Sequence, residues 1–227
     1  MRDFPIFTTD YGVSTLILRE IPYREEAYIR VQDVQPGFEE EHLRECVSFC
    51  RMAGAEKIYG TGKGMEGYPA FMDVVQMRGT IRPDPEMQEC LFPVTEATVS
   101  QWRKLYNEAM RTVDNARTLE SRDEKLLTEK AGAYFIHKNG ELLGIGWLED
   151  HKILAVASAV KGAGMRIVHT LLSSVDGEDV ELEVASTNGR AIALYEKLGL
   201  VKTKVLEHWQ DLTGCGRGLR IDDSSEL

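Results

Sequence analysis

The feature that most constrains the fold is an apolar segment that runs through a glycine turn directly into an amphipathic helix. Residues 154–157 are predicted to be a strand, Gly162 and Gly164 form the turn, and residues 165–172 have helical periodicity. A helix start leaves about four backbone N–H groups unpaired and carries a partial positive charge. The turn therefore predicts an anion site suited to a pyrophosphate, although similar turns are often purely structural.

A second strand, polar turn and helix follow at residues 180–201, and Gly199 ends the helix. The two motifs are Val156-x-x-x-x-Lys161-Gly162-x-Gly164 and Asn188-x-x-Ala191-x-x-Leu194-Tyr195-x-x-x-Gly199. The first resembles the pyrophosphate loop of the GNAT acyltransferases, and the second resembles their second coenzyme A motif. Their order and separation also match this family.

The resemblance implies an α/β (α+β) fold, in which helices flank a mixed, mostly antiparallel sheet. It implies an acetyl-CoA-dependent N-acetyltransferase whose acceptor is a primary amine of a small molecule or peptide. Two alternatives remain open: a non-catalytic module that binds coenzyme A or acetyl-CoA as a sensor, and a remnant fold that binds no ligand.

The resemblance also implies where the cofactor lies, between parallel strands at residues 153–157 and 180–184 that splay apart. Strand backbone groups would hold the thioester, amides of the glycine loop would hold the pyrophosphate, and Lys161 would add positive charge. The implied cofactor-binding residues are Leu154, Ala155, Val156, Lys161, Gly162, Ala163, Gly164, Met165, Arg166, Asn188 and Tyr195.

Arg166 departs from the family pattern, which usually has a third small residue at this position. The side chain either crowds the cofactor or turns outward and forms a charge-assisted contact with a phosphate. We favour the second arrangement, because both earlier glycines are retained.

Tyr195 is the expected general acid, since a phenol with a reference pKa near 10 can serve as a positioned donor to a thiolate. The alternative is a tyrosine that only packs its ring on the sheet. Glu149 and His151 are candidates for the base, with His151 having the reference pKa nearer neutrality. Alternatively, both lie in a solvated hairpin turn.

The chain is expected to divide into a segment of residues 1–88, a GNAT-like domain of residues 89–211 and a flexible tail of residues 212–227. Within the first segment, strands are predicted at residues 14–19, 27–32 and 56–60, with a helix at 39–52. This order resembles a degenerate partial copy of the same fold without its glycine loop; an unrelated α/β extension is the alternative. The prolines at residues 83–85 place the boundary at residues 82–89.

Several further elements are predicted in the second part. A strand is expected at residues 91–94, and a helix whose apolar face includes Trp102 and Tyr106 should begin with a capping box at Thr98. Residues 115–128 form either a short helix or a mobile connection. The Asn139-Gly140 pair lies between two apolar runs and predicts a hairpin.

The composition limits the classes of binding partner and the cellular locations that we expect. The 227 residues include 37 acidic and 27 basic ones, and the net charge of −10 argues against nucleic-acid binding. No membrane span or signal peptide is apparent, so we expect a cytoplasmic protein. Because the four cysteines lack metal-site spacing, reduced thiols and no metal are expected. A monomer and a homodimer are both compatible with the sequence.

Overall fold

Two units, each with its own buried core, make up the chain. The computed structural model describes residues 5–82, 84–114, 116–129, 132–175 and 179–215. One unit contains the residues up to Met72 and those from Glu207 onward, and the other contains Asp73–Leu206. The chain passes between the units along two long strands, β5 (Ala70–Thr80) and β11 (Val201–Asp211).

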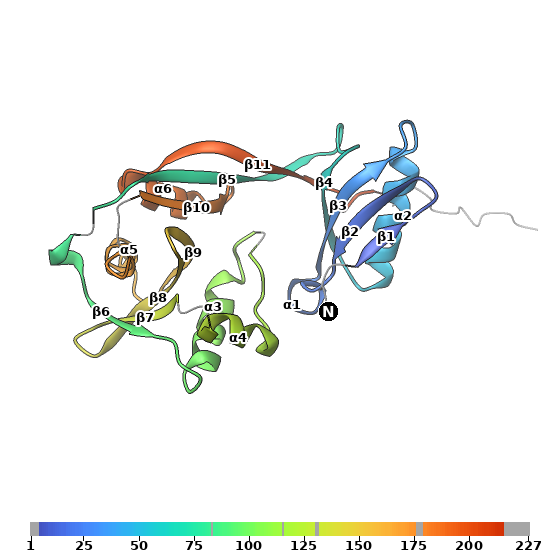
Figure 1. The fold of residues 1–227 in the computed structure, drawn as a ribbon. Helices are drawn as coiled ribbons and strands as arrows, with labels where there is room; N and C mark the ends of the chain where they lie inside the picture. Colours follow the sequence, from blue (N-terminus) through green and yellow to red (C-terminus); the bar gives the residue numbers. More distant parts are fainter. Residues whose placement is uncertain (1–4, 83, 115, 130–131, 176–178, 216–227) are drawn as a thin grey trace, which may run out of the picture. The chain divides into compact units, whose positions relative to one another are not determined.

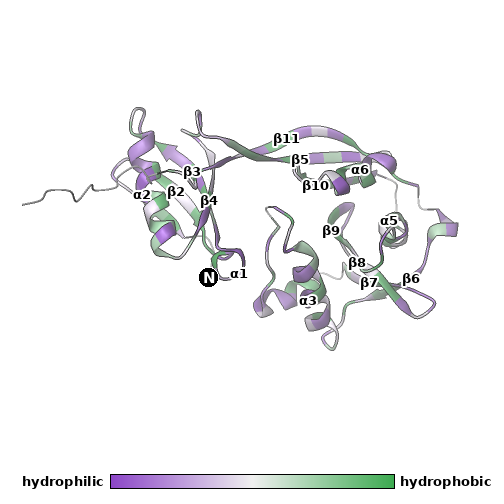
Figure 2. Ribbon diagram, turned by 180° about the vertical axis from the view of Figure 1, so that it is seen from behind, coloured by the Kyte–Doolittle hydropathy of each residue, from purple (hydrophilic) through white to green (hydrophobic). Residues whose placement is uncertain are grey.

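The first unit is a small sheet with one long helix packed on it. Its strands lie in the order β1-β2-β3-β4, antiparallel except for the parallel pair β3–β4, and the end of β11 pairs antiparallel with β4. Helix α2 contacts β2 and β3, and it carries both hydrophilic and hydrophobic residues (Figures 1 and 2). The elements are β1 (Ile6–Thr8), β2 (Gly12–Ile17), α1 (Ile21–Arg24), β3 (Glu26–Val34), α2 (Glu39–Met52) and β4 (Lys57–Gly62).

The second unit holds the glycine loop and both predicted motifs. Its strands β5 to β10 lie in the order β5-β10-β9-β8-β7-β6, and among their described residues only the pair β9–β10 is parallel. Besides β5 and the start of β11, its elements are η1 (Pro85–Met87), β6 (Cys90–Pro93), α3 (Val99–Met110), η2 (Ser121–Asp123), α4 (Glu124–Glu129), β7 (Ala133–Lys138), β8 (Glu141–Glu149), β9 (Lys152–Ser158), α5 (Gly164–Leu172), β10 (Asp179–Ala185) and α6 (Gly189–Lys197).

Helices cover both faces of the β7–β8–β9 strands. Ile145 and Ala155 pack in a cluster with Trp102 of α3, while Gly146 of β8 lies against Leu171 of α5. Because successive strand residues point to opposite faces, α3 and α5 lie on opposite sides of these strands (Figure 1). The predicted mixed, mostly antiparallel sheet flanked by helices is therefore confirmed.

Most of the predicted elements form close to their predicted positions. The helix at residues 39–52 has the predicted bounds, and Asn139 and Gly140 adopt positive φ angles of 52° and 85° between β7 and β8. The segment at residues 115–128 contains η2 and part of α4, which favours the short-helix alternative over a mobile connection. No helix in the described residues is long and apolar enough to cross a membrane.

Three expectations differ from the structure. Thr98 precedes α3, but its side chain bonds with Thr95 rather than forming the predicted capping box. Residues 84–89 are hydrogen-bonded to α5, so the division of the chain does not fall at residues 82–89. Leu212 is buried and its N–H donates to Ile58, although it was expected in the flexible tail; residues 216–227 of that tail lie outside the described residues.

Candidate functional site

The parallel strands β9 and β10 pair only at their beginnings. Lys152 is opposite Glu181 and Ile153 is opposite Leu182, and the described residues show no later pair between these strands. Each strand continues along its other neighbour, β9 with β8 and β10 with β5. The facing edges of residues 154–158 and 183–185 are therefore separated, and their backbone groups are available to a ligand.

A β-bulge marks the point where the separation begins. Across β8 and β9, Leu148 is opposite Ile153 and Trp147 is opposite Ala155, which leaves Leu154 as the extra residue. The Leu154 side chain is among the exposed large apolar ones, at 36% exposure. A bulge bends its strand and increases the local twist, which gives a physical reason for β9 to leave β10 after Ile153.

The glycine loop follows β9 and presents a set of unpaired N–H groups. Gly162 has a φ of 88°, a conformation that glycine adopts without strain, and Ala163 caps α5. In the described part of the chain, no backbone carbonyl accepts from the N–H groups of Lys161, Gly162, Gly164, Met165 and Arg166. The predicted anion site requires such a cluster of donors at a helix start, and anion binding itself stays a prediction.

The two loop glycines have different structural roles. A Cβ on Gly164 would lie 2.9 Å from Cδ2 of Leu194, so this glycine allows α5 to approach α6 closely. A Cβ on Gly162 would meet no atom within 4 Å, and only its positive φ requires glycine. A side chain at either position therefore disturbs the loop by a different mechanism.

The Asn188 side chain caps the N-terminus of its own helix. It is the N-cap of α6, and its side-chain oxygen accepts from the N–H of Ala191 at 3.1 Å. This contact satisfies one of the unpaired donors at the helix start. A structural role thus accounts for the side chain, and its predicted contact with the cofactor stays a prediction.

Tyr195 lies on α6 with its ring in the core of the second unit and is 7% exposed. Burial raises the pKa of Tyr195 to about 12, so the phenol stays protonated at neutral pH. Among the described residues its hydroxyl makes no hydrogen bond, and this oxygen is not one of the completely buried polar atoms that lack a partner. The ring packs as the structural alternative expected, while the hydroxyl remains free to donate.

The two base candidates lie at the other end of β9 from the glycine loop. Glu149 is the last residue of β8, and His151 lies in the two-residue turn before β9. Both are exposed, and both precede the region where β9 leaves β10. Leu154 is three residues beyond His151, about 10 Å along a strand. Their role as base stays a prediction.

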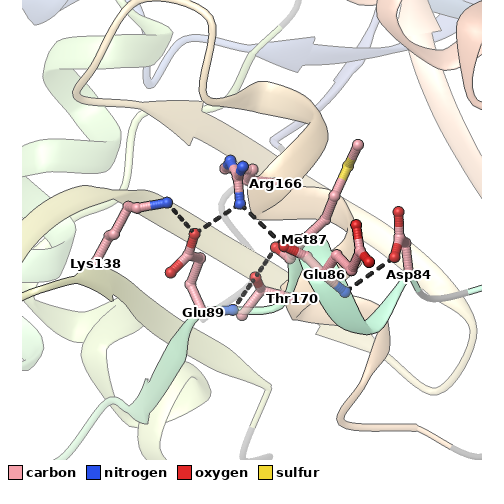
Figure 3. A network of polar contacts seen from close by, with 7 residues as sticks. All are labelled: Asp84, Glu86, Met87, Glu89, Lys138, Arg166 and Thr170. Atoms are coloured by element: carbon pink, nitrogen blue, oxygen red, sulfur yellow. Dashed lines mark hydrogen bonds and ion pairs between the residues drawn. The ribbon is translucent and has the colours of Figure 1, made fainter.

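The Arg166 side chain is held by acceptors that lie outside the glycine loop. Its Nη1 donates to Oε1 of Glu89 at 2.9 Å and to the Glu86 carbonyl at 3.3 Å (Figure 3). Sequence reasoning placed Arg166 at the helix start but missed Glu89, which lies 77 residues earlier in the chain. No local pattern marks Glu89 as its partner.

The chain was compared with known proteins. No protein-family model matches the chain. Over 72 residues the chain is 36% identical to an N-alpha-acetyltransferase from Sulfurisphaera tokodaii. The matched residues make up 32% of this chain and 41% of that protein. The chain thus spans about two fifths of the length of the curated relatives that it matches.

Two solved structures have a similar fold. One is a GCN5-related N-acetyltransferase from Kribbella flavida, with a TM-score of 0.53 and 11% identity over 90% of this chain and 58% of that one. The other is a tandem GNAT protein from the clavulanic acid biosynthesis pathway, with a TM-score of 0.51 and 12% identity over 92% of this chain and 84% of that one. At such identity, these structures establish the fold.

Proposed function

We propose that this chain, which belongs to the GNAT superfamily, transfers the acetyl group of acetyl-CoA to a primary amine. The observation that carries the proposal is the separation of β9 from β10 directly before a loop in which five N–H groups have no backbone acceptor among the described residues. One edge suits an extended amide-bearing chain, and the loop suits a pyrophosphate. Acetyl-CoA carries both groups on one molecule.

The residues present fit this cofactor without requiring a particular side chain. Backbone groups of Leu154, Ala155 and Val156 lie on the unpaired edge of β9 and would pair with the pantetheine and the thioester. The loop amides would hold the pyrophosphate, and Lys161 adds positive charge. When bound, acetyl-CoA supplies the activated acetyl group.

The chemistry requires a neutral amine, stabilisation of a developing oxyanion and a proton for the leaving thiolate. Backbone N–H groups near the Leu154 bulge would stabilise the oxyanion. The Tyr195 hydroxyl, which is protonated and unpartnered in the described residues, would donate the proton. Glu149 or His151 would accept a proton from the amine, directly or through water.

For the acceptor we propose the α-amino group of a peptide. The support is the curated relative from Sulfurisphaera tokodaii, whose name describes N-alpha-acetyl transfer. A small-molecule amine remains the competing acceptor, because the match covers less than half of that relative.

Calorimetry with acetyl-CoA and a thiol-release assay test the two parts of this proposal. We expect saturable binding, and thiol release with peptides that have a free α-amine but not with their N-acetylated counterparts. Gly164→Leu should abolish binding because its side chain collides with Leu194, whereas Gly189→Ala, in open space at the start of α6, should not. Binding without thiol release for any amine would favour a non-catalytic module, and undetectable binding would defeat the proposal.

A further inference from the structure

The segment Asp84–Glu89 is fastened along α5 by side chains that share one face of that helix. Nδ1 of His169 accepts from the Asp84 N–H at 3.1 Å, and Oγ1 of Thr170 accepts from the Glu89 N–H at 3.0 Å. Arg166 completes the face through its bonds to this segment. The segment is therefore held along α5 from Arg166, in the first turn next to the glycine loop, to Thr170 in the second turn.

Within this arrangement, two cations share one carboxylate oxygen. Oε1 of Glu89 accepts from Nζ of Lys138 and from Nη1 of Arg166, each at 2.9 Å (Figure 3). The Glu89 side chain is 13% exposed, whereas those of Lys138 and Arg166 are 41% and 40% exposed. The hydrogen bond from Lys138 is the main cause that lowers the pKa of Glu89. At neutral pH these three side chains carry a net charge of about +1.

These charges lie at the same end of the sheet as the loop. Lys138 ends β7, which pairs with β8, and the Leu143 carbonyl of β8 accepts from the N–H groups of Ala159 and Val160 in the loop. Arg166 itself contributes one of the unpaired loop amides. The excess positive charge therefore adjoins the proposed pyrophosphate site.

Part of the Arg166 guanidinium is not used by these hydrogen bonds. Both of its bonds to the segment use Nη1, and its Nε and Nη2 have no partner in the described part of the chain. Arginine presents five N–H donors in a rigid fork, so one guanidinium can contact Glu89 and a phosphate together.

We propose that Arg166 is a specificity-determining ligand for the phosphates of coenzyme A and that Glu89 restrains it by competing for its charge. This inference rests on the proposed function of the glycine loop. The negative charge of Glu89 weakens the attraction between Arg166 and a phosphate. Lys138 reduces this effect, because it donates to the same carboxylate oxygen and partly neutralises its charge. The ion pairs thus set the affinity for the phosphate-bearing part of the cofactor.

The proposal is tested by substituting Glu89 and Lys138 separately, because the two substitutions should change the affinity for coenzyme A in opposite directions. Glu89→Gln keeps a hydrogen-bond acceptor and removes the competing charge, so the affinity for coenzyme A should rise about 3- to 10-fold. In Lys138→Gln, Arg166 is the cation of this group that still pairs with Glu89, so the affinity for coenzyme A should fall about 3-fold. Arg166→Gln should weaken binding roughly 10- to 100-fold, the scale of a lost charge-assisted bond. Calorimetry at constant ionic strength measures all three.

Two controls separate this role from a purely structural one. Pantetheine lacks the phosphates, so its binding should not respond to Arg166→Gln. Glu181→Gln breaks an ion pair with Arg78, of 2.5 Å, at the paired end of β10 and should leave the affinity for coenzyme A unchanged. In the double variant of Glu89 and Arg166, the gain from Glu89→Gln should vanish, since the gain acts through Arg166.

The outcomes distinguish this inference from the proposed function. If the wild type binds coenzyme A but Glu89→Gln and Lys138→Gln both weaken binding, the ion pairs only fasten the segment and the inference is wrong. Unchanged affinity in Arg166→Gln would overturn it equally. If the wild type binds no coenzyme A, both this inference and the proposed function fail. Thermal unfolding of each variant shows whether the fold is retained.

Discussion

At the scale of single residues, Tyr195 combines a ring fixed in the core with a hydroxyl that has no protein partner in the described residues. Tyr195→Phe keeps the ring and removes only the proton. If the hydroxyl is the general acid, turnover should fall by roughly 10² to 10⁴, with little change in the affinity for acetyl-CoA. Single-turnover thiol release is the appropriate measurement, because product release can hide a chemical defect.

The same variant distinguishes catalysis from packing. Removing an unpartnered hydroxyl from a buried ring should cost little stability, so the thermal unfolding of Tyr195→Phe should resemble that of the wild type. Retained turnover would remove Tyr195 from the mechanism. A collapse of folding together with cofactor binding would show that the hydroxyl has a structural role.

The role of a residue can be predicted from the sequence when its neighbours in the chain determine it, and not when a residue far away in the chain does. The demand for glycine at residue 162 follows from the turn it makes, and its φ of 88° agrees with that. The position of Arg166 in the loop follows from the motif, but the direction of its side chain does not. Glu89 determines that direction from 77 residues away, and a contact of that separation leaves no local pattern.

At the scale of elements, periodic segments are predicted best. Helix α2 has strong helical periodicity and forms over the predicted residues Glu39–Met52. Strand β5 was not predicted, because it follows a glycine-rich stretch and depends on its pairing with β10 along residues 74–80. The bulge at Leu154 was missed for a similar reason, since it exists only as a mismatch in register between β8 and β9.

The cap of α6 gives a prediction at this scale. Asn188→Ala removes the acceptor for the Ala191 N–H, so the free energy of unfolding of the second unit should fall by about 1 kcal/mol. Asn188→Ser restores an N-cap oxygen and should recover most of that loss. Urea unfolding measures both variants. If Asn188→Ala instead keeps its stability and loses affinity for acetyl-CoA, the side chain contacts the cofactor as the family resemblance implied.

At the scale of the whole molecule, the two units share an order of elements. In the first, β1, β2 and β3 are antiparallel, and α2 then leads to β4, parallel to β3. In the second, β7, β8 and β9 are antiparallel, and α5 leads to β10, parallel to β9. We propose that the first unit is a degenerate partial copy of the half of the second unit that carries the loop, because both follow this order of elements.

The first unit lacks the features that make the second a candidate cofactor site. Strands β3 and β4 stay paired over six residues, from Glu26↔Lys57 to Val31↔Gly62, so no strand edges separate. The first turn of α2 carries three glutamates at residues 39–41, which repel an anion at that helix start. The N–H of Gly37 is already occupied by Oε2 of Glu39, at 2.8 Å.

These differences predict one cofactor per chain despite the repeated order of elements. Calorimetric titration with acetyl-CoA should give a stoichiometry near one, because only the β9–β10 side offers separated strand edges and unpaired loop amides among the described residues. Gly164→Leu should reduce that value to zero. A residual site in this variant, or a stoichiometry near two in the wild type, would mean that the first unit also binds, in spite of its glutamates. Replacing those three glutamates with glutamine should not create a second site, because the continuous pairing of β3 with β4 still closes the edge that the pantetheine needs.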